Sequence, residues 1–275
     1  MGFRGAFTGA VGTAGSGGVM RKRSESVEEY LEAIYKLSRD DGEGDGGATV
    51  SQLAAALQVS PPSVSEMLGR LRAAGLVEEG GGRGVALTPQ GEREGASLVR
   101  RHRLSERFLT EILDVPWDEV HAEACRFEHA ISPEVEARLA AQLGYPRTCP
   151  HGHAIPDEDG ACVEEPLRPL AELEPGEHAT IGRISDEQPE LLRYLASLGL
   201  LPDTSVIVES VAPFGGPLLV RVGDAQYALG REVAGKLLVR ERPGERGAGR
   251  GGAAHARGGR PKRARVRGRR QDRDA

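Results

Sequence analysis

The sequence changes character at Gly144, and this change implies more than one folding unit. Before Gly144, apolar residues recur at helical spacing, as in the face formed by Tyr30, Leu31, Ile34, Tyr35 and Leu37. Beyond it, a segment rich in Pro and Gly leads into short strand-like runs at 179–184, 205–211, 218–222 and 226–229, which turn residues separate and one helical insert from Pro189 to Leu198 interrupts. The helical part is expected to include helices from Pro89 to Leu113, from Trp117 to Phe127 or a little beyond, and from Pro133 to Leu143. The 275 residues are enough for one large domain or two ordinary ones. We therefore expect a helical N-terminal part, a linker and a small β-rich C-terminal part.

Charge is distributed unevenly along the chain. The segment from Arg242 to the end carries +9, with twelve Lys or Arg against three Asp or Glu, so within a total of −5 the rest of the chain carries −14. An acidic body with a basic tail is therefore expected. Three cysteines do not make a disulfide framework, and no apolar run is long enough to span a bilayer. These features predict a soluble, cytoplasmic protein without a membrane partner.

Residues 24–92 show the element order of a winged helix-turn-helix. A helix beginning at Ser24 is followed by a Gly- and Asp-rich loop and by two short helices, Val50 to Leu57 and Ser63 to Ala74. Gly75 is the residue type expected just past a helix end. Two apolar strands around a glycine-rich turn, between Leu76 and Thr88, then indicate a β-hairpin.

The second helix of such a motif can lie in the DNA major groove, with its N-terminal residues at the base edges. Candidate DNA contacts are the side chains at its start, those further along it and the hairpin tip: Ser60, Pro62, Ser63, Glu66, Arg70, Arg72 and Arg83. The alternative is that the domain only dimerises or docks another protein.

The stretch from His121 to His129 carries a possible metal site. Read as a helix, it places His121, Cys125, Glu128 and His129 along one stripe, and the preceding helix offers His102 and Glu106 four residues apart. Imidazole, thiolate and carboxylate donors together suit a divalent transition metal. The alternative is a set of polar residues on solvated helix faces.

With these motifs the chain resembles the diphtheria-toxin-repressor family of metal-dependent transcriptional repressors, from about Ser24 to Glu241. The most specific stretches are Arg101-His-Arg-Leu-Ser-Glu-Arg and Val120-His-Ala-Glu-Ala-Cys-Arg-Phe-Glu-His. The resemblance implies mainly α structure with small β parts: a winged helix-turn-helix, a helical dimerisation domain and a C-terminal SH3-like barrel. It also implies a homodimer that binds double-stranded operator DNA.

The resemblance further implies two metal sites. The primary, activating site is similar to Glu29, Cys125, Glu128 and His129, and the ancillary site to His102, Glu106 and His121. Glu32 matches a second acidic ligand of the manganese-responsive branch, whereas Cys125 follows the iron branch. Glu187 and Gln188 are the nearest counterparts of ancillary ligands from the SH3-like domain, and plain surface residues are the alternative there.

The mixed ligand set leaves the metal open. A carboxylate at Glu29 favours Mn²⁺, and a thiolate at Cys125 favours Fe²⁺, Co²⁺, Ni²⁺ or Zn²⁺. We expect Fe²⁺ or Mn²⁺ as the physiological cofactor, with iron slightly ahead, and substitution by Co²⁺, Ni²⁺ or Zn²⁺ in vitro. A second cluster, Cys149, His151 and His153 with Cys162 further on, matches no closed zinc finger, and an ordinary loop is the favoured interpretation.

The sequence thus predicts a metal-activated transcriptional repressor of metal-homeostasis genes, with no small-molecule substrate. One alternative is a winged-helix regulator without metal control. The other is a metallohydrolase, which would leave the helix-turn-helix unexplained and lacks the His-Glu-x-x-His motif. The SH3-like part could also bind polyproline-type segments. The expected divisions are a disordered arm (1–23), the winged helix-turn-helix (24–92), the helical metal-binding and dimerisation domain (93–144), a linker (145–168), the SH3-like domain (169–241) and a disordered basic tail (242–275).

Overall fold

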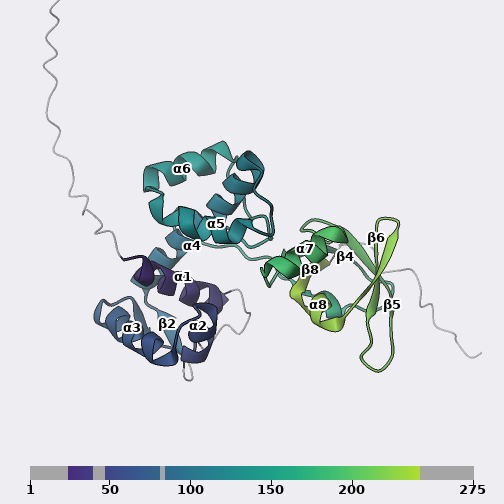
Figure 1. The fold of residues 1–275 in the computed structure, drawn as a ribbon, viewed down its shortest axis with the longest axis horizontal. Helices are drawn as coiled ribbons and strands as arrows, with labels where there is room; N and C mark the ends of the chain where they lie inside the picture. Colours follow the sequence, from purple (N-terminus) through teal and green to yellow (C-terminus); the bar gives the residue numbers. More distant parts are fainter. Residues whose placement is uncertain (1–23, 40–46, 81–83, 242–275) are drawn as a thin grey trace, which may run out of the picture.

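A computed structural model of the protein describes residues 24–39, 47–80 and 84–241. Figure 1 shows the N-terminal helices in purple and blue, the middle helices in teal, and a sheet-containing part in green and yellow. The predictions for the arm (1–23), the basic tail (242–275) and Arg83 lie outside the described residues. The order of parts confirms the predicted fold class.

The first part is a winged helix-turn-helix. It contains α1 (Glu25–Arg39), α2 (Val50–Ala56), α3 (Pro61–Ala73) and the antiparallel strands β1 (Val77–Glu79) and β2 (Val85–Leu87). Thr49 and Gln52 form a capping box at α2, and the Ser60 hydroxyl caps α3. Gly75 has φ +71°, the left-handed conformation that ends α3 and turns the chain into β1.

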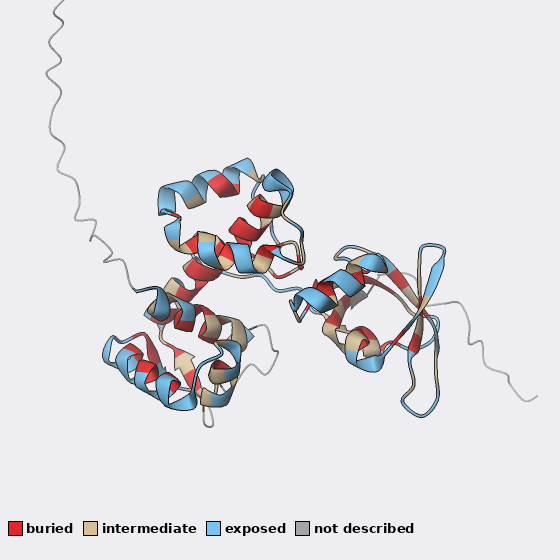
Figure 2. Ribbon diagram, in the orientation of Figure 1, coloured by how far each residue is buried: buried red, intermediate tan, exposed pale blue. Residues whose placement is uncertain are grey.

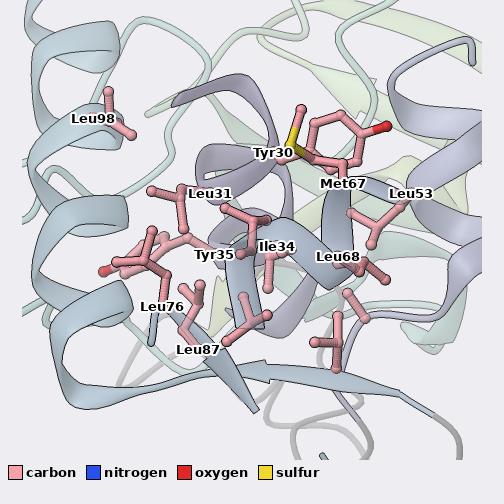
Figure 3. Close-up of a cluster of buried hydrophobic side chains, with 14 of the residues drawn as sticks. Tyr30, Leu31, Ile34, Tyr35, Leu53, Met67, Leu68, Leu76, Leu87 and Leu98 are labelled. Atoms are coloured by element: carbon pink, nitrogen blue, oxygen red, sulfur yellow. The ribbon is translucent and has the colours of Figure 1, made fainter. Parts of the chain in front are cut away.

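These elements share one apolar core with α4 (Pro89–Leu113), drawn in Figure 3, where side chains from α1, α2, α3, β2 and α4 meet. Leu31, Ile34 and Leu53 are completely buried, and Tyr35 is nearly so. In Figure 2 the buried residues of this part face inward and the exposed ones form its outer surface. α1 packs along α4, which joins the winged helix-turn-helix directly to the first helix of the middle part.

Gly91 marks the closest approach in this packing. It lies in the first turn of α4 (Pro89–Leu113), where an added Cβ would come within 2.0 Å of the Leu76 backbone oxygen. We expect Gly91→Ala to destabilise the domain by about 2 kcal/mol, because the backbone must shift to accept the methyl group. Urea unfolding of the metal-free protein measures this change.

Gly69→Ala is the matched control. Gly69 lies on α3, and its added Cβ would meet nothing within 4 Å. Alanine in a helix interior is favoured over glycine by roughly 0.5–1 kcal/mol, so this variant should be slightly more stable. Equal stability of the two variants would contradict the close packing at Gly91.

The middle part is helical and consists of α4, α5 (Val120–Phe127), the 3₁₀ turn η1 (Glu128–Ala130) and α6 (Pro133–Gln142). The predicted bounds of α4 are confirmed. The helix predicted from Trp117 starts only at Val120, and it ends at Phe127, so Glu128 and His129 lie in η1 rather than on α5. This tighter turn changes the direction in which the last two residues of the stripe point.

The C-terminal part is built on a six-stranded antiparallel sheet of order β3-β8-β4-β5-β6-β7. Its elements are β3 (Arg168–Pro169), the short 3₁₀ turn η2 (Leu170–Glu172), β4 (His178–Ile184), α7 (Pro189–Ser197), β5 (Ser205–Val211), β6 (Leu218–Val222), β7 (Ala225–Leu229), α8 (Arg231–Lys236) and β8 (Leu237–Glu241). The sequence predicted β4 to β7 and α7 but not β3, α8 or β8. None of the described helices could cross a membrane.

Candidate metal centre and nucleic-acid interface

A cavity of about 920 Å³ lies where α1, α4 and α5 meet the segment before α7. Its walls contain most of the metal-ligand candidates. On α4, His102 and Glu106 are one turn apart and face the cavity together. On α5, His121 and Cys125 have the same spacing. The structure therefore brings the two predicted stripes into one place.

One cluster joins α1, α4 and η1. His102 Nδ1 lies 2.5 Å from Glu128 Oε2 and 3.6 Å from Glu32 Oε1. Glu32 and Glu128 are both buried. The ligand atoms of these three residues all lie within 4.8 Å of one another, which is close enough to share an ion.

Glu28, and not the predicted Glu29, carries the contact between α1 and His129. Its Oε2 lies 2.8 Å from His129 Nδ1, and His129 Nε2 lies 3.7 Å from Glu128 Oε1. Glu28 and Glu32 are four residues apart, so they share one face of α1, whereas Glu29 is exposed and lines the cavity. The structure thus adds Glu28 to the predicted residues through its contact with His129, and it keeps Glu29 in the cavity wall.

Cys125 lies with the α4 and α5 imidazoles rather than beside His129. Its Sγ is 3.7 Å from His121 Nε2, and His121 Nδ1 is 3.2 Å from His102 Nε2. Burial raises the pKa of the Cys125 thiol, but hydrogen bonds and positive charge from His102 and His121 outweigh burial and lower it to about 6. The thiolate is the form that binds metals.

A further cluster brings together Glu106, Cys149, His151 and Glu187, whose ligand atoms also lie within 4.8 Å of one another. His151 Nδ1 is 3.6 Å from both Glu106 Oε1 and Glu187 Oε1. Glu187 Oε2 is 2.6 Å from His121 Nδ1, so this carboxylate also reaches the α5 stripe. Gln188, predicted together with Glu187, is exposed at the start of α7. It lines the cavity but does not belong to any of these ligand clusters.

The backbone of the expected linker explains how Cys149 and His151, for which the sequence favoured an ordinary loop, come to lie in this cluster. Cys149 N donates to His153 O, and Ile184 N donates to His151 O, which joins this loop to β4. Gly152 has φ +92°, and a Cβ there would come within 2.0 Å of the Gly182 oxygen. The loop is therefore pressed against the sheet, with Cys149, His151 and His153 all buried.

The charges in the cavity compensate one another. Burial lowers the pKa of an imidazole, but Glu106, Glu187 and neighbouring thiols outweigh it, raising the pKa values of His121 and His151 to about 11. Burial raises the pKa of Glu106, yet His102, His121 and His151 hold it well below its ordinary value. Burial also raises the pKa of Glu128, to about 7, with a contribution from Glu32.

Two buried atoms in these clusters, Glu106 Oε2 and His151 Nδ1, lack a hydrogen-bond partner among the described residues, and Glu32 Oε1 has the Lys36 ammonium group 2.6 Å away. Buried polar atoms normally find partners, so orphans in a cavity indicate that an ion or water completes the site. Carboxylate oxygens, imidazole nitrogens and thiolates are donors for first-row divalent metals. The residues present therefore fit such a metal.

The raised imidazole pKa values predict a pH-dependent metal affinity. Protonated His121 and His151 stabilise the metal-free fold below pH 6.5, and this contribution is lost as the pH rises toward 11. A metal requires the free nitrogen, so binding displaces protons. We expect the apparent Mn²⁺ affinity to rise at least about tenfold per pH unit between pH 6.5 and 8.5, for one displaced proton. Competition with a fluorescent chelator measures it, and a flat profile would contradict it.

The predicted DNA-contacting residues at α3 lie on its outer face. Ser60, Pro62, Ser63, Glu66 and Arg70 are all exposed, as is Arg72. The Ser60 and Ser63 hydroxyls lie 2.9 Å apart, and Ser60 also accepts from the Ser63 backbone. Val64, Met67, Leu68 and Leu71 anchor the opposite face in the core. This face is available to a duplex.

Family models match nearly all of the described chain. They are the "Iron dependent repressor, N-terminal DNA binding domain" (residues 22–85), the "Iron dependent repressor, metal binding and dimerisation domain" (residues 88–157) and the "FeoA domain" (residues 168–241). The chain is similar to the iron-dependent repressor IdeR of Mycobacterium tuberculosis (strain H37Rv), at 34% identity over 235 residues, 80% of this chain and 99% of that protein.

Solved structures agree. A manganese-dependent transcriptional repressor in complex with manganese is 36% identical, with a TM-score of 0.72, over 78% of this chain and all of that one. IdeR of T. acidophilum is 30% identical, with a TM-score of 0.66, over 80% of this chain and all of that one. Similarity thus extends over the DNA-binding, middle and C-terminal parts together.

Proposed function

The chain belongs to the iron-dependent repressor family, and on this premise we propose that it is a metal-activated transcriptional repressor that binds operator DNA as a homodimer. It is not an enzyme, since the family consists of transcriptional repressors. The observation that carries the proposal is the position of the ligand clusters. They join α1 of the DNA-binding part to α4, η1 and the segment before α7.

We assign the primary site to Glu28, Glu32, His102, Glu128 and His129, with Cys125 at its border toward His121. The ancillary site takes Glu106, His121, Cys149, His151 and Glu187. The positive charges of the protein only partly balance the buried carboxylates. A bound divalent metal would supply the missing positive charge. The carboxylate-rich primary set suits Fe²⁺ or Mn²⁺, and the ancillary thiolate broadens the choice toward Co²⁺, Ni²⁺ or Zn²⁺.

The side chains that hold the metal also set the position of α1. Glu28 and Glu32 come from α1, and His129 and Glu128 come from η1, so closing the primary site fixes the DNA-binding part against the middle helices. In a dimer this fixes the spacing of the two α3 helices, which must match two operator half-sites. Metal and DNA would then favour the same conformation, and each would increase the affinity for the other.

Exposed apolar side chains support a homodimer through the middle part. Ile112 and Leu113 are about half exposed at the end of α4, and Val135 is exposed on α6. Such residues are costly to leave in water and are typical of subunit interfaces. A repressor acting on chromosomal operators is expected to work in the cytoplasm.

DNA binding as a function of metal tests the proposal. A duplex selected from random sequences in the presence of Mn²⁺ would be titrated anaerobically with protein in chelator, Fe²⁺, Mn²⁺, Zn²⁺ and Co²⁺. We expect tight binding only with metal, and a size of two chains per duplex in sedimentation. Equal affinity in chelator and in every metal would favour a winged-helix regulator without metal control.

A further inference from the structure

Lys36 is a positively charged residue in the wall of the metal-ligand cavity that the proposed function does not use. It lies on α1, one turn beyond Glu32, and its side chain is 27% exposed. Its Nζ lies 2.6 Å from Glu32 Oε1. The same oxygen faces His102 Nδ1 at 3.6 Å. The ammonium group therefore lies beside one of the carboxylates assigned to the primary site.

Lys36 carries a positive charge at neutral pH, as lysine side chains ordinarily do. Burial alone would lower the pKa of its ammonium group, but the carboxylates of Glu32 and Glu187 outweigh burial and raise it. Arg103, which opposes them, donates to the Ala154 carbonyl oxygen. Burial raises the pKa of Glu32, and Lys36 and His102 reverse this and hold it low. Lys36 and Glu32 thus form a charged pair inside the cavity.

The Lys36–Glu32 pair is a close, charge-assisted contact, with Nζ 2.6 Å from Glu32 Oε1. An ordinary Glu–Lys pair one turn apart lies on the solvated face of a helix and contributes only a few tenths of a kcal/mol. Here the carboxylate is 7% exposed and belongs to a ligand cluster.

We propose that Lys36 is a tethered cation that competes with the metal for Glu32, and so lowers the affinity of the primary site and sets the metal concentration to which the protein responds. The inference rests on the proposed function, because it assumes that the Glu32, His102 and Glu128 cluster binds a metal. When the site is empty, Lys36 supplies part of the positive charge that these carboxylates need. When the site fills, the ion would take the Glu32 carboxylate, and Lys36 would lose this partner.

The test is a Mn²⁺ titration of full-length protein against a fluorescent chelator, with wild type, Lys36→Met, Lys36→Arg, Glu32→Gln and the double variant Glu32→Gln/Lys36→Met. Removing one like charge from a partly buried site should tighten Mn²⁺ binding about tenfold in Lys36→Met. Lys36→Arg keeps the positive charge, so its Mn²⁺ affinity should equal that of the wild type. In the Glu32→Gln background, Lys36→Met should change the affinity less than about twofold, since the competition acts through Glu32.

Thermal unfolding supplies a second readout. Metal-free Lys36→Met should melt below the wild type, because Glu32 has lost its counter-ion, and saturating Mn²⁺ should raise its Tm by more than it raises that of the wild type. Unchanged or weaker Mn²⁺ binding in Lys36→Met, beside a wild type that binds Mn²⁺, would overturn only this inference. This inference would also be overturned if Lys36→Met tightened Mn²⁺ binding as much in the Glu32→Gln background as in the wild-type background. A wild type that binds no Mn²⁺, and whose DNA binding ignores metal, would overturn the proposed function as well.

Discussion

Glu28→Gln is expected to lower the metal-activated affinity for operator DNA by about 100-fold, the upper range of coupling between two ligands of one protein. Glu28 Oε2 lies 2.8 Å from His129 Nδ1 and is the contact between α1 and η1. The amide keeps the shape of the side chain but removes its negative charge. The primary site then loses both a hard donor and its tie to the DNA-binding part. Fluorescence anisotropy of a labelled operator in saturating Mn²⁺ measures the loss.

Glu29→Gln is the matched control, since it makes the same chemical change at the adjacent residue. Glu29 is exposed, and adjacent helical residues differ by about 100° in direction, so Glu29 does not share the direction of Glu28. We expect its DNA affinity to stay within about twofold of the wild type, as is usual for surface substitutions. The reverse result, a defect in Glu29→Gln alone, would show that Glu29 is the α1 ligand that the sequence resemblance indicated. Binding measured in chelator separates a metal defect from a general one.

The contact between α1 and His129 shows where sequence reasoning reached its limit. The apolar residues of α1 predicted its buried face correctly, with Tyr30, Leu31, Ile34 and Tyr35 all in the core. Adjacent helical residues differ by about 100° in direction. A small rotation of α1 therefore changes which of two neighbouring residues faces His129, and matching the sequence to the family cannot detect such a rotation. Only the placement of η1 decides that Glu28, and not Glu29, meets His129.

Helix boundaries were predictable where local signals mark them. Thr88 and Pro89 begin α4, and Gly75 follows the end of α3, so their bounds follow from capping rules. The change from α5 to a 3₁₀ turn at Glu128 has no comparable signal in the sequence. It arises from tertiary packing, in which Glu128 is drawn to His102 of the neighbouring helix.

The Cys149 and His151 pair could not be recognised from spacing alone. A closed zinc site can be recognised in a sequence because its ligands lie near one another along the chain. Here the other members are Glu106, more than forty residues before Cys149, and Glu187, more than thirty after His151. The sheet contact of the loop, through Gly152 and Ile184, is what brings them together. The sequence did not predict β8, because this strand pairs with β4, more than fifty residues earlier. It did not predict the short helix α8 before it either.

Glu106→Gln should have the second large effect, removing one bound metal per chain and weakening metal-activated DNA binding by roughly 10- to 100-fold. Glu106 is buried, and its Oε1 lies 3.2 Å from His102 Nε2, 3.3 Å from His121 Nδ1 and 3.6 Å from His151 Nδ1. It is the carboxylate that His121 and His151 of the ancillary site share with His102 of the primary site. An amide cannot balance their charge or offer two anionic oxygens. Metal content after gel filtration, with anisotropy on the same samples, measures both effects.

Glu111→Gln on the same helix is the control. Glu111 is exposed and pairs with Arg107, so it lies outside the cavity and should leave metal content and DNA affinity unchanged. Glu106 is buried and contacts several imidazoles, so its replacement can also lower the stability of the fold. Thermal unfolding in chelator measures this effect separately. A folded Glu106→Gln protein that keeps its full metal content would remove Glu106 from the ancillary site. A loss of metal with unaltered DNA affinity would instead show that the primary site alone controls the operator.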